Sequence, residues 1–231
     1  MSLQLKAGTT LAVVGESGSG KSTLARCLLQ LHPFDSGEVI FQGQNLANLD
    51  KNALRHVRKH LQMVFQDPFA SLNPRMRVGE IIQEGLVIHG IGNAQAQQKQ
   101  VHQMLERVGL TAADAQKYPH EFSGGQRQRI GIARALILQP KVVVCDEPVS
   151  ALDVSVQAQI LLLLKELQQE MGLSYLFITH DLRVVRHIAN EMMVMHKGKV
   201  VEQGLVSEIY QAPQQAYTQQ LLQAIPGRKA A

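Results

Sequence analysis

The sequence predicts an α/β fold built around a largely parallel β-sheet. Short apolar runs typical of strands alternate with helical stretches through most of the chain. Two of these runs, Val142–Cys145 and Tyr175–Ile178, are continuously apolar, as is typical of strands covered by helices on both faces, and we expect them to be central. The expected strands are Leu11–Val14, Glu38–Phe41, Leu61–Phe65, Lys141–Asp146 and Ser174–Thr179.

The composition is that of a globular protein. Of the 231 residues, 45% are hydrophobic and 18% charged, which provides enough apolar surface to exclude disorder. The formal charge of +4 is spread along the chain and only 4% of residues are aromatic, so nucleic-acid binding gains little support. No apolar run approaches the roughly 18 residues of a membrane span, and Met1–Gly8 lacks the features of a secretion signal. We therefore expect a cytosolic protein.

Several reactive side chains are interpreted as structural. Cys27 and Cys145 both lie in apolar segments and are predicted to be buried core residues. His56 and His60 are four residues apart on a predicted helix, a spacing compatible with a metal site. Basic residues flank both histidines, so a solvated basic face is the favoured interpretation.

The middle of the chain is predicted to be helical. Val78–His89, Ala94–Val108 and Gly124–Leu138 read as consecutive helices with no strand between them. This pattern predicts a helical lobe over residues 73–139, inserted into a core formed by residues 1–72 and 140–231.

The end of the chain combines a hairpin with a short helix. Met192–Met195 and Lys199–Glu202 flank Lys197-Gly198, a dipeptide that favours a tight turn between antiparallel strands. Thr218–Ala224 is predicted to be a helix that ends before Pro226-Gly227.

A phosphate-binding loop follows the first expected strand. Its pattern is GxxxxGK[ST], and it precedes a predicted helix over Leu24–Leu31. Glycines let the backbone curl so that successive N–H groups converge on phosphate oxygens at a helix start, while Lys21 reaches the outer phosphates and the Ser22 hydroxyl ligates Mg²⁺. The candidate nucleotide-binding residues are Gly15, Glu16, Ser17, Gly18, Ser19, Gly20, Lys21, Ser22 and Thr23.

Two adjacent carboxylates end the apolar strand at Asp146 and Glu147. Because side chains alternate along a strand, the two acids are expected to point in different directions and to do different work. Asp146 suits the Mg²⁺ shell, and Glu147 suits the polarisation of a water for attack on the terminal phosphate. Together with the loop, this pair indicates a nucleoside triphosphatase.

A second glycine-bearing motif narrows the class. Ser123, Gly124, Gly125 and Gln126 lie in the segment Phe122–Arg129, which ends about 17 residues before Asp146. They stand at the start of a predicted helix, where exposed N–H groups favour phosphate. With this motif the chain resembles the ATP-binding cassette (ABC) ATPases, whose Ser-Gly-Gly-Gln signature completes the nucleotide site of a partner subunit. The resemblance implies ATP as the nucleotide and Mg²⁺ as the metal.

Other family elements occur in the expected order. Gln66, in Phe65-Gln-Asp-Pro68, matches a glutamine that senses Mg²⁺ and links the site to transmembrane partners. Asp153 belongs to a Ser-Ala-Leu-Asp stretch that matches the loop crossing the dimer interface. His180 matches a switch histidine that contacts the γ-phosphate, so the resemblance implies catalytic roles for Glu147, His180 and Gln66.

Longer stretches resemble the oligopeptide, dipeptide and nickel importers. They include Phe65–Pro74, Asp146–Asp153 and Tyr217–Pro226, and the resemblance covers most of the chain from about Gly8 to Pro226. It implies an ATP-hydrolysing importer subunit that pairs with a second ATPase subunit, binds integral-membrane permeases at the cytoplasmic face of the inner membrane, and serves a solute-binding protein indirectly. No nucleic acid is expected as a partner.

The resemblance also implies a P-loop NTPase core with an inserted helical lobe and an N-terminal antiparallel β-lobe. Only fourteen residues precede Gly15 and none is aromatic, whereas the family has about 20 to 30 with an adenine-stacking aromatic. We therefore expect an incomplete β-lobe or a fragment of a longer chain.

Two alternatives remain open at this point. A soluble ABC-type ATPase could act on nucleic acid or the ribosome, but such proteins carry large insertions or basic arms that this sequence lacks. Exporter subunits are usually fused to membrane-spanning segments, and none is predicted here.

Overall fold

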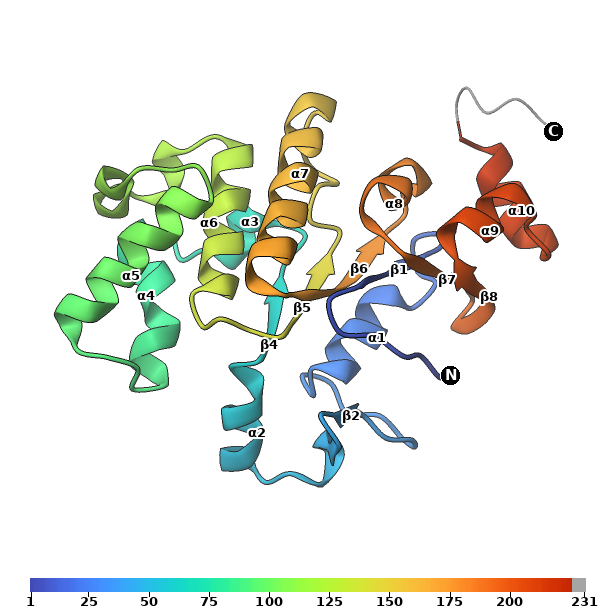
Figure 1. The fold of residues 1–231 in the computed structure, drawn as a ribbon, viewed down its shortest axis with the longest axis horizontal. Coiled ribbons are helices and arrows are strands. Elements are labelled where there is room, and N and C mark those ends of the chain that lie inside the picture. The colour runs from blue at the N-terminus through green and yellow to red at the C-terminus, as the bar shows by residue number, and fades with distance from the viewer. Residues whose placement is uncertain (226–231) are drawn as a thin grey trace.

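A six-stranded sheet crosses the centre of the protein in the computed structural model, which describes residues 1–225 (Figure 1). The strand order is β4-β5-β6-β1-β7-β8, and all neighbours are parallel except β7 and β8. The predicted α/β class is confirmed, and β5 and β6 lie inside the sheet as expected. The strands are β1 (Thr10–Val14), β4 (Leu61–Val64), β5 (Val142–Asp146), β6 (Ser174–Thr179), β7 (Glu191–His196) and β8 (Lys199–Leu205).

Helices cover both faces of this sheet. Helix α1 (Lys21–Leu28) lies on one face, and α7 (Val154–Met171) and α8 (Leu182–Ile188) lie on the other (Figure 1). Val143 and Cys145 of β5 pack into the cluster beneath α7, whereas Val144 packs into the cluster beneath α1. Burial on both sides explains why this strand is apolar at successive positions.

The elements between β4 and β5 are all helices or 3₁₀ turns, and this segment extends beyond one end of the sheet (Figure 1). The three predicted helices are present there and share one buried cluster with β5 and α7. Its elements are α3 (Pro68–Ser71), α4 (Val78–Ile88), α5 (Ala94–Arg107), the 3₁₀ turns η2 (Ala112–Gln116) and η3 (Pro119–Glu121), and α6 (Gly124–Leu136).

The strand expected at Glu38–Phe41 does not join the main sheet. Only β2 (Ile40–Phe41) is extended, and it pairs antiparallel with β3 (Gln44–Asn45) in a separate two-stranded sheet. The reason is local, because Gln42 and Gly43 both have positive φ, 50° and 80°, and close a tight hairpin. The chain continues through η1 (Leu46–Asn48) and α2 (Lys51–Arg58).

Three further expectations need correction. Helix α1 begins at Lys21 and ends at Leu28, earlier than Leu24–Leu31, because it starts inside the loop motif. Cys145 is buried as predicted, but Cys27 is only partly buried on α1. His60 lies beyond the end of α2, so it does not share that helix with His56. Among residues 1–225, no cluster of three or more His, Cys, Asp or Glu side chains is arranged to hold a metal ion.

The predicted hairpin near the end of the chain is confirmed. Lys197 and Gly198 connect β7 and β8 and both have positive φ, 46° and 77°. Helices α9 (Val206–Gln211) and α10 (Ala216–Gln223) follow, the second beginning two residues before the predicted start. Pro226-Gly227 lies outside the described residues. Within the described part of the chain, every helix is too short or too polar to cross a membrane.

Candidate nucleotide site

The predicted site residues meet at the carboxyl edge of the parallel sheet. They are the residues of the phosphate loop together with Gln66, Glu147 and His180. The loop follows β1, Asp146 ends β5, His180 follows β6, and Gln66 lies two residues after β4. Because these strands are neighbours, their ends enclose a cavity of about 690 Å³, the position where open α/β sheets bind ligands. It is lined by Gly15, Glu16, Ser17, Gly18, Gly20, Lys21, Ser22, Thr23, Gln66, Glu147, His180 and Leu221.

Backbone geometry makes two glycines of the loop irreplaceable. A Cβ on Gly15 would stand 2.1 Å from the backbone oxygen of Met195, so the loop presses directly on β7. Gly20 adopts a left-handed conformation, with φ 99°, as the N-cap of α1. Since no side chain caps this helix, its first N–H groups remain available to an anion at its positive end.

Lys21 is buried at the base of the loop. Its ammonium donates hydrogen bonds of 2.8 Å to the backbone oxygens of both Gly15 and Glu16. Burial lowers the pKa of Lys21, while the carboxylates of Glu147 and Asp146 oppose that shift. The loop therefore holds a single cation beneath the position where phosphates would sit.

Ser22 and Asp146 form an adjacent oxygen pair. The Ser22 hydroxyl donates a 3.0 Å hydrogen bond to Asp146 Oδ1. Desolvation raises the pKa of Asp146, which the Ser22 hydrogen bond partly offsets and the neighbouring Glu147 reinforces. A hydroxyl and a buried carboxylate side by side are suitable ligands for Mg²⁺, which prefers oxygen ligands.

Glu147, which follows β5, contacts side chains that follow the neighbouring strands β4 and β6. Its Oε2 accepts a 3.2 Å hydrogen bond from Gln66 Nε2 and lies 3.0 Å from His180 Nδ1. The backbone of Glu147 has φ 46°, an unusual conformation for a residue with a Cβ, and its side chain is 14% exposed. Glu147 and Asp146 thus make separate contacts, as strand alternation suggests.

The signature residues Ser123, Gly124, Gly125 and Gln126 do not line this cavity. Ser123 caps α6 by accepting from the Gln126 N–H at 3.3 Å, and the Gln126 amide oxygen accepts from the Ser123 N–H. Asp153 caps the neighbouring α7, accepting from the Val156 N–H at 3.0 Å. The signature and Asp153 therefore sit together at two helix starts, apart from the phosphate loop.

Sequence reasoning missed the contribution of α10. Leu221 lines the cavity, and the Tyr217 hydroxyl accepts a 3.3 Å hydrogen bond from the Glu16 N–H. The segment beginning at Tyr217 carried a family resemblance, but nothing local in it indicates contact with a loop some 200 residues away in sequence.

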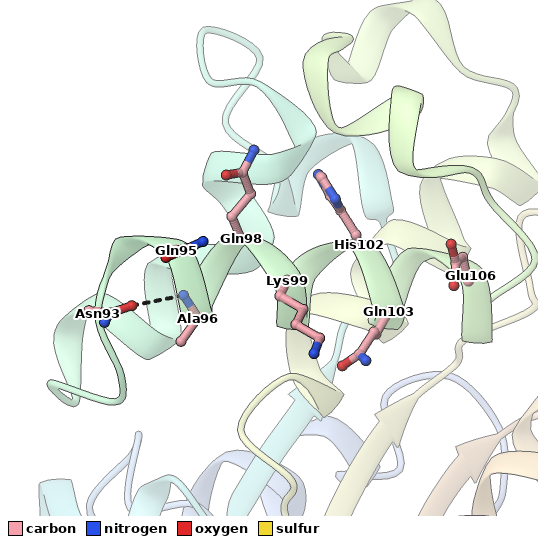
Figure 2. A pocket seen from close by; sticks show the side chains of 8 residues that line it. All are labelled: Asn93, Gln95, Ala96, Gln98, Lys99, His102, Gln103 and Glu106. Atoms are coloured by element: carbon pink, nitrogen blue, oxygen red, sulfur yellow. Dashed lines mark hydrogen bonds between the residues drawn. The ribbon is translucent and has the colours of Figure 1, made fainter.

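Another hollow runs along the outer side of α5, and Figure 2 shows its side chains pointing from one helix. Gln98, Lys99 and His102 are among them, and none of the predicted nucleotide residues lies there. All of its lining residues belong to α5 and its N-cap, so no second element helps to form a site there.

Comparison with known proteins identifies the family. The family described as ABC transporter matches residues 1–150. The oligopeptide transport ATP-binding protein AppF of Bacillus subtilis is 52% identical over 98% of this chain and 69% of its own length. The dipeptide transport ATP-binding protein DppF of Haemophilus influenzae is 53% identical, with the same coverage. The glutathione import ATP-binding protein GsiA of Salmonella typhimurium is also 53% identical, but this chain covers 36% of it.

Solved structures agree with this assignment. CbiO1 from Clostridium perfringens, described as part of the transporter complex cbiONQ, superposes with a TM-score of 0.83 at 29% identity, covering 92% of this chain and 83% of its own. The ATP-binding cassette MJ0796, described as a dimer bound to ADP and phosphate, gives 0.79 at 30% identity and 88% coverage of both chains. The chain therefore belongs to the ABC transporter family and is an ATP-binding, ATP-hydrolysing cassette.

Proposed function

We propose that the chain is the ATPase subunit of an importer for peptides or a related small solute. Its relatives are described as oligopeptide, dipeptide and glutathione transport proteins, which favours this function over a soluble ATPase acting on nucleic acid or the ribosome. The observation that carries the ATPase part of the proposal is the convergence of Lys21, Glu147 and His180 on one cavity while Ser123–Gln126 lies outside it.

Each side chain has a role in this proposal. Loop N–H groups and Lys21 bind the phosphates, and Ser22, Asp146 and Gln66 would hold Mg²⁺, which when bound neutralises phosphate charge. Glu147 accepts the proton of the attacking water. His180 holds the carboxylate of Glu147 in place. It would contact the terminal phosphate of bound ATP.

The position of the signature motif supports a paired ATPase. Ser123 accepts the Gln126 N–H at this helix start, but the positive end of the helix still favours phosphate. This helix start does not face the loop of its own chain. We propose that Ser123–Gln126 and Asp153 complete the cavity of a second subunit, identical or related. ATP then holds two subunits together and hydrolysis releases them, in keeping with the dimeric description of MJ0796.

The helical lobe, residues 73–139, would carry this motion to membrane permeases. Gln66 contacts Glu147, and the segment that follows it contacts α6: Arg127 lies 4.3 Å over the ring of Phe69 and Arg134 donates to the Ser71 carbonyl. Phe69 is 64% exposed. We propose the surface over residues 67–75 as the docking site for permeases, with the protein held at the cytoplasmic face of the inner membrane.

Replacement of Glu147 by glutamine tests the catalytic assignment. Glu147→Gln is expected to bind ATP like the parent and to hydrolyse it about 100-fold more slowly or worse, because the proton acceptor is lost. Lys21→Ala is expected to weaken ATP binding itself. The exposed Glu166→Gln on α7 is the matched control and should retain both properties. Near-parental turnover by Glu147→Gln would remove Glu147 from the mechanism.

Recovery of partners from membranes tests the transport role. Affinity capture of the chain from detergent-solubilised membranes is expected to recover integral-membrane permease subunits. Recovery of ribosomes or nucleic acid in their place would favour the soluble alternative.

A further inference from the structure

The start of the phosphate loop rests on the C-terminal quarter of the chain. The Gly198 N–H donates a 3.1 Å hydrogen bond to the Ser19 carbonyl, and the Met195 carbonyl blocks any side chain at Gly15. The third contact comes from α10, where the Tyr217 hydroxyl oxygen accepts the Glu16 N–H. The first two contacts are made by backbone atoms of residues 195 and 198. Of the three, only the contact of Tyr217 is made by a side chain, so only this contact can be removed by a substitution that leaves the backbone unchanged.

Helix α10 is firmly anchored beside the loop. The carboxylate of Glu202 on β8 accepts the N–H groups of Gln214 and Gln215, at 2.8 and 3.2 Å, just before the helix begins. Thr218 and Leu222 are each 1% exposed, and Leu222 packs in the same cluster as Val14, the residue that leads into the loop. These contacts hold α10, and with it the Tyr217 side chain, at a fixed position beside the loop.

The face of α10 that carries Tyr217 and Leu221 is turned toward the nucleotide cavity. Tyr217 and Leu221 are one helical turn apart, and Leu221 lines the cavity. The Tyr217 ring packs against His196, with ring centroids 4.0 Å apart. This packing limits where the hydroxyl can lie.

The peptide group between Gly15 and Glu16 links Tyr217 to Lys21. Its carbonyl accepts from the Lys21 ammonium at 2.8 Å, and its N–H donates to Tyr217. Because a peptide group is planar, fixing the N–H also fixes the direction of the carbonyl.

We propose that Tyr217 is a positioning residue for nucleotide binding. By holding the Glu16 N–H, it orients the Gly15 carbonyl that in turn places the ammonium of Lys21 for the phosphates. This inference rests on the proposed ATP site and adds α10 to it. The effect should appear in binding and leave the chemical step unchanged, because Tyr217 contacts neither Glu147 nor His180.

Tyr217→Phe tests the proposal, because it removes the hydroxyl and keeps the ring on His196. A net hydrogen bond of ordinary strength corresponds to about a 2- to 12-fold rise in the Kd for ATP, measured by calorimetry, with kcat at saturating ATP unchanged. Amide hydrogen exchange at Glu16 should also become faster. Gln220→Ala, on the exposed side of α10, is the matched control and should leave all three quantities at parental values.

The outcomes separate this proposal from the ATP site itself. A parental Kd in Tyr217→Phe, or a fall in kcat with Kd unchanged, would overturn the positioning role. An equal rise in Kd for Gln220→Ala would also overturn it, because a general disturbance of α10 would then suffice. If neither the parent chain nor Lys21→Ala binds ATP, the assignment of the ATP site is wrong. That result is distinct from a parental Kd in Tyr217→Phe, which contradicts only the role of Tyr217.

Discussion

Gly125 of the signature motif is predicted to be a packing residue as well as part of a phosphate site. A Cβ at this position would stand 2.5 Å from Cγ1 of Val156 on α7, closer than real carbon contacts allow. Valine in a helix has one strongly preferred rotamer, so this methyl group cannot easily turn aside. Gly125→Ala should therefore push α6 and α7 apart.

The expected cost follows from two opposing terms. Overpacking of a methyl group costs about 1–3 kcal/mol, while glycine to alanine within a helix gains about 0.5–1 kcal/mol. The difference between these terms is about 0–2.5 kcal/mol, so we expect Gly125→Ala to lower the free energy of unfolding by up to about 2.5 kcal/mol. Gly131 provides the control on the same helix, because a Cβ there meets no atom within 4 Å. Gly131→Ala should instead raise the free energy of unfolding by about 0.5–1 kcal/mol.

Urea denaturation of both variants measures these values, and a double-mutant cycle identifies the contact. Val156→Ala removes the offending methyl, leaving the Val156 Cβ position at 3.8 Å, which is ordinary contact. In that background the penalty of Gly125→Ala should vanish, giving a coupling energy of at least about 1 kcal/mol. Equal stabilisation by Gly125→Ala and Gly131→Ala would refute the reasoning.

Three other outcomes are expected. Gly15→Ala should abolish ATP binding and destabilise the fold in urea, because its Cβ would overlap the Met195 carbonyl, which is rigid backbone. In the native chain, a thiol reagent followed by absorbance should label Cys27 and spare Cys145, whose pKa is raised by complete burial. Burial and neighbouring cations lower the pKa of His89, so its contribution to stability is present above pH 6.5 and is lost as the pH falls below it. In urea denaturation, the free energy of unfolding of His89→Gln should therefore fall less between pH 7.5 and pH 5.5 than that of the parent. An equal fall in both proteins would contradict this assignment.

Local sequence predicts the chemistry of the phosphate loop and the positions of the central strands. The loop is predictable because its N–H groups, Lys21 and Ser22 lie within nine consecutive residues, whose spacing alone brings them together. The strands Val142–Cys145 and Tyr175–Ile178 are predictable because burial on both faces leaves an apolar residue at each successive position. Family resemblance supplied Gln66 and His180, which local patterns alone would not distinguish from surface residues.

Tertiary structure decided how these separate pieces meet. Gln66 and His180 are 81 and 33 residues from Glu147, and they reach one carboxylate because β4, β5 and β6 are neighbours in the sheet. The contact of Tyr217 with the loop depends in the same way on where β8 and Glu202 place α10. The sequence alone determined the candidate phosphate loop, because the groups of that loop depend on short-range spacing. Strand order determined which other residues share a cavity with it, because contacts between distant residues depend on how whole elements pack.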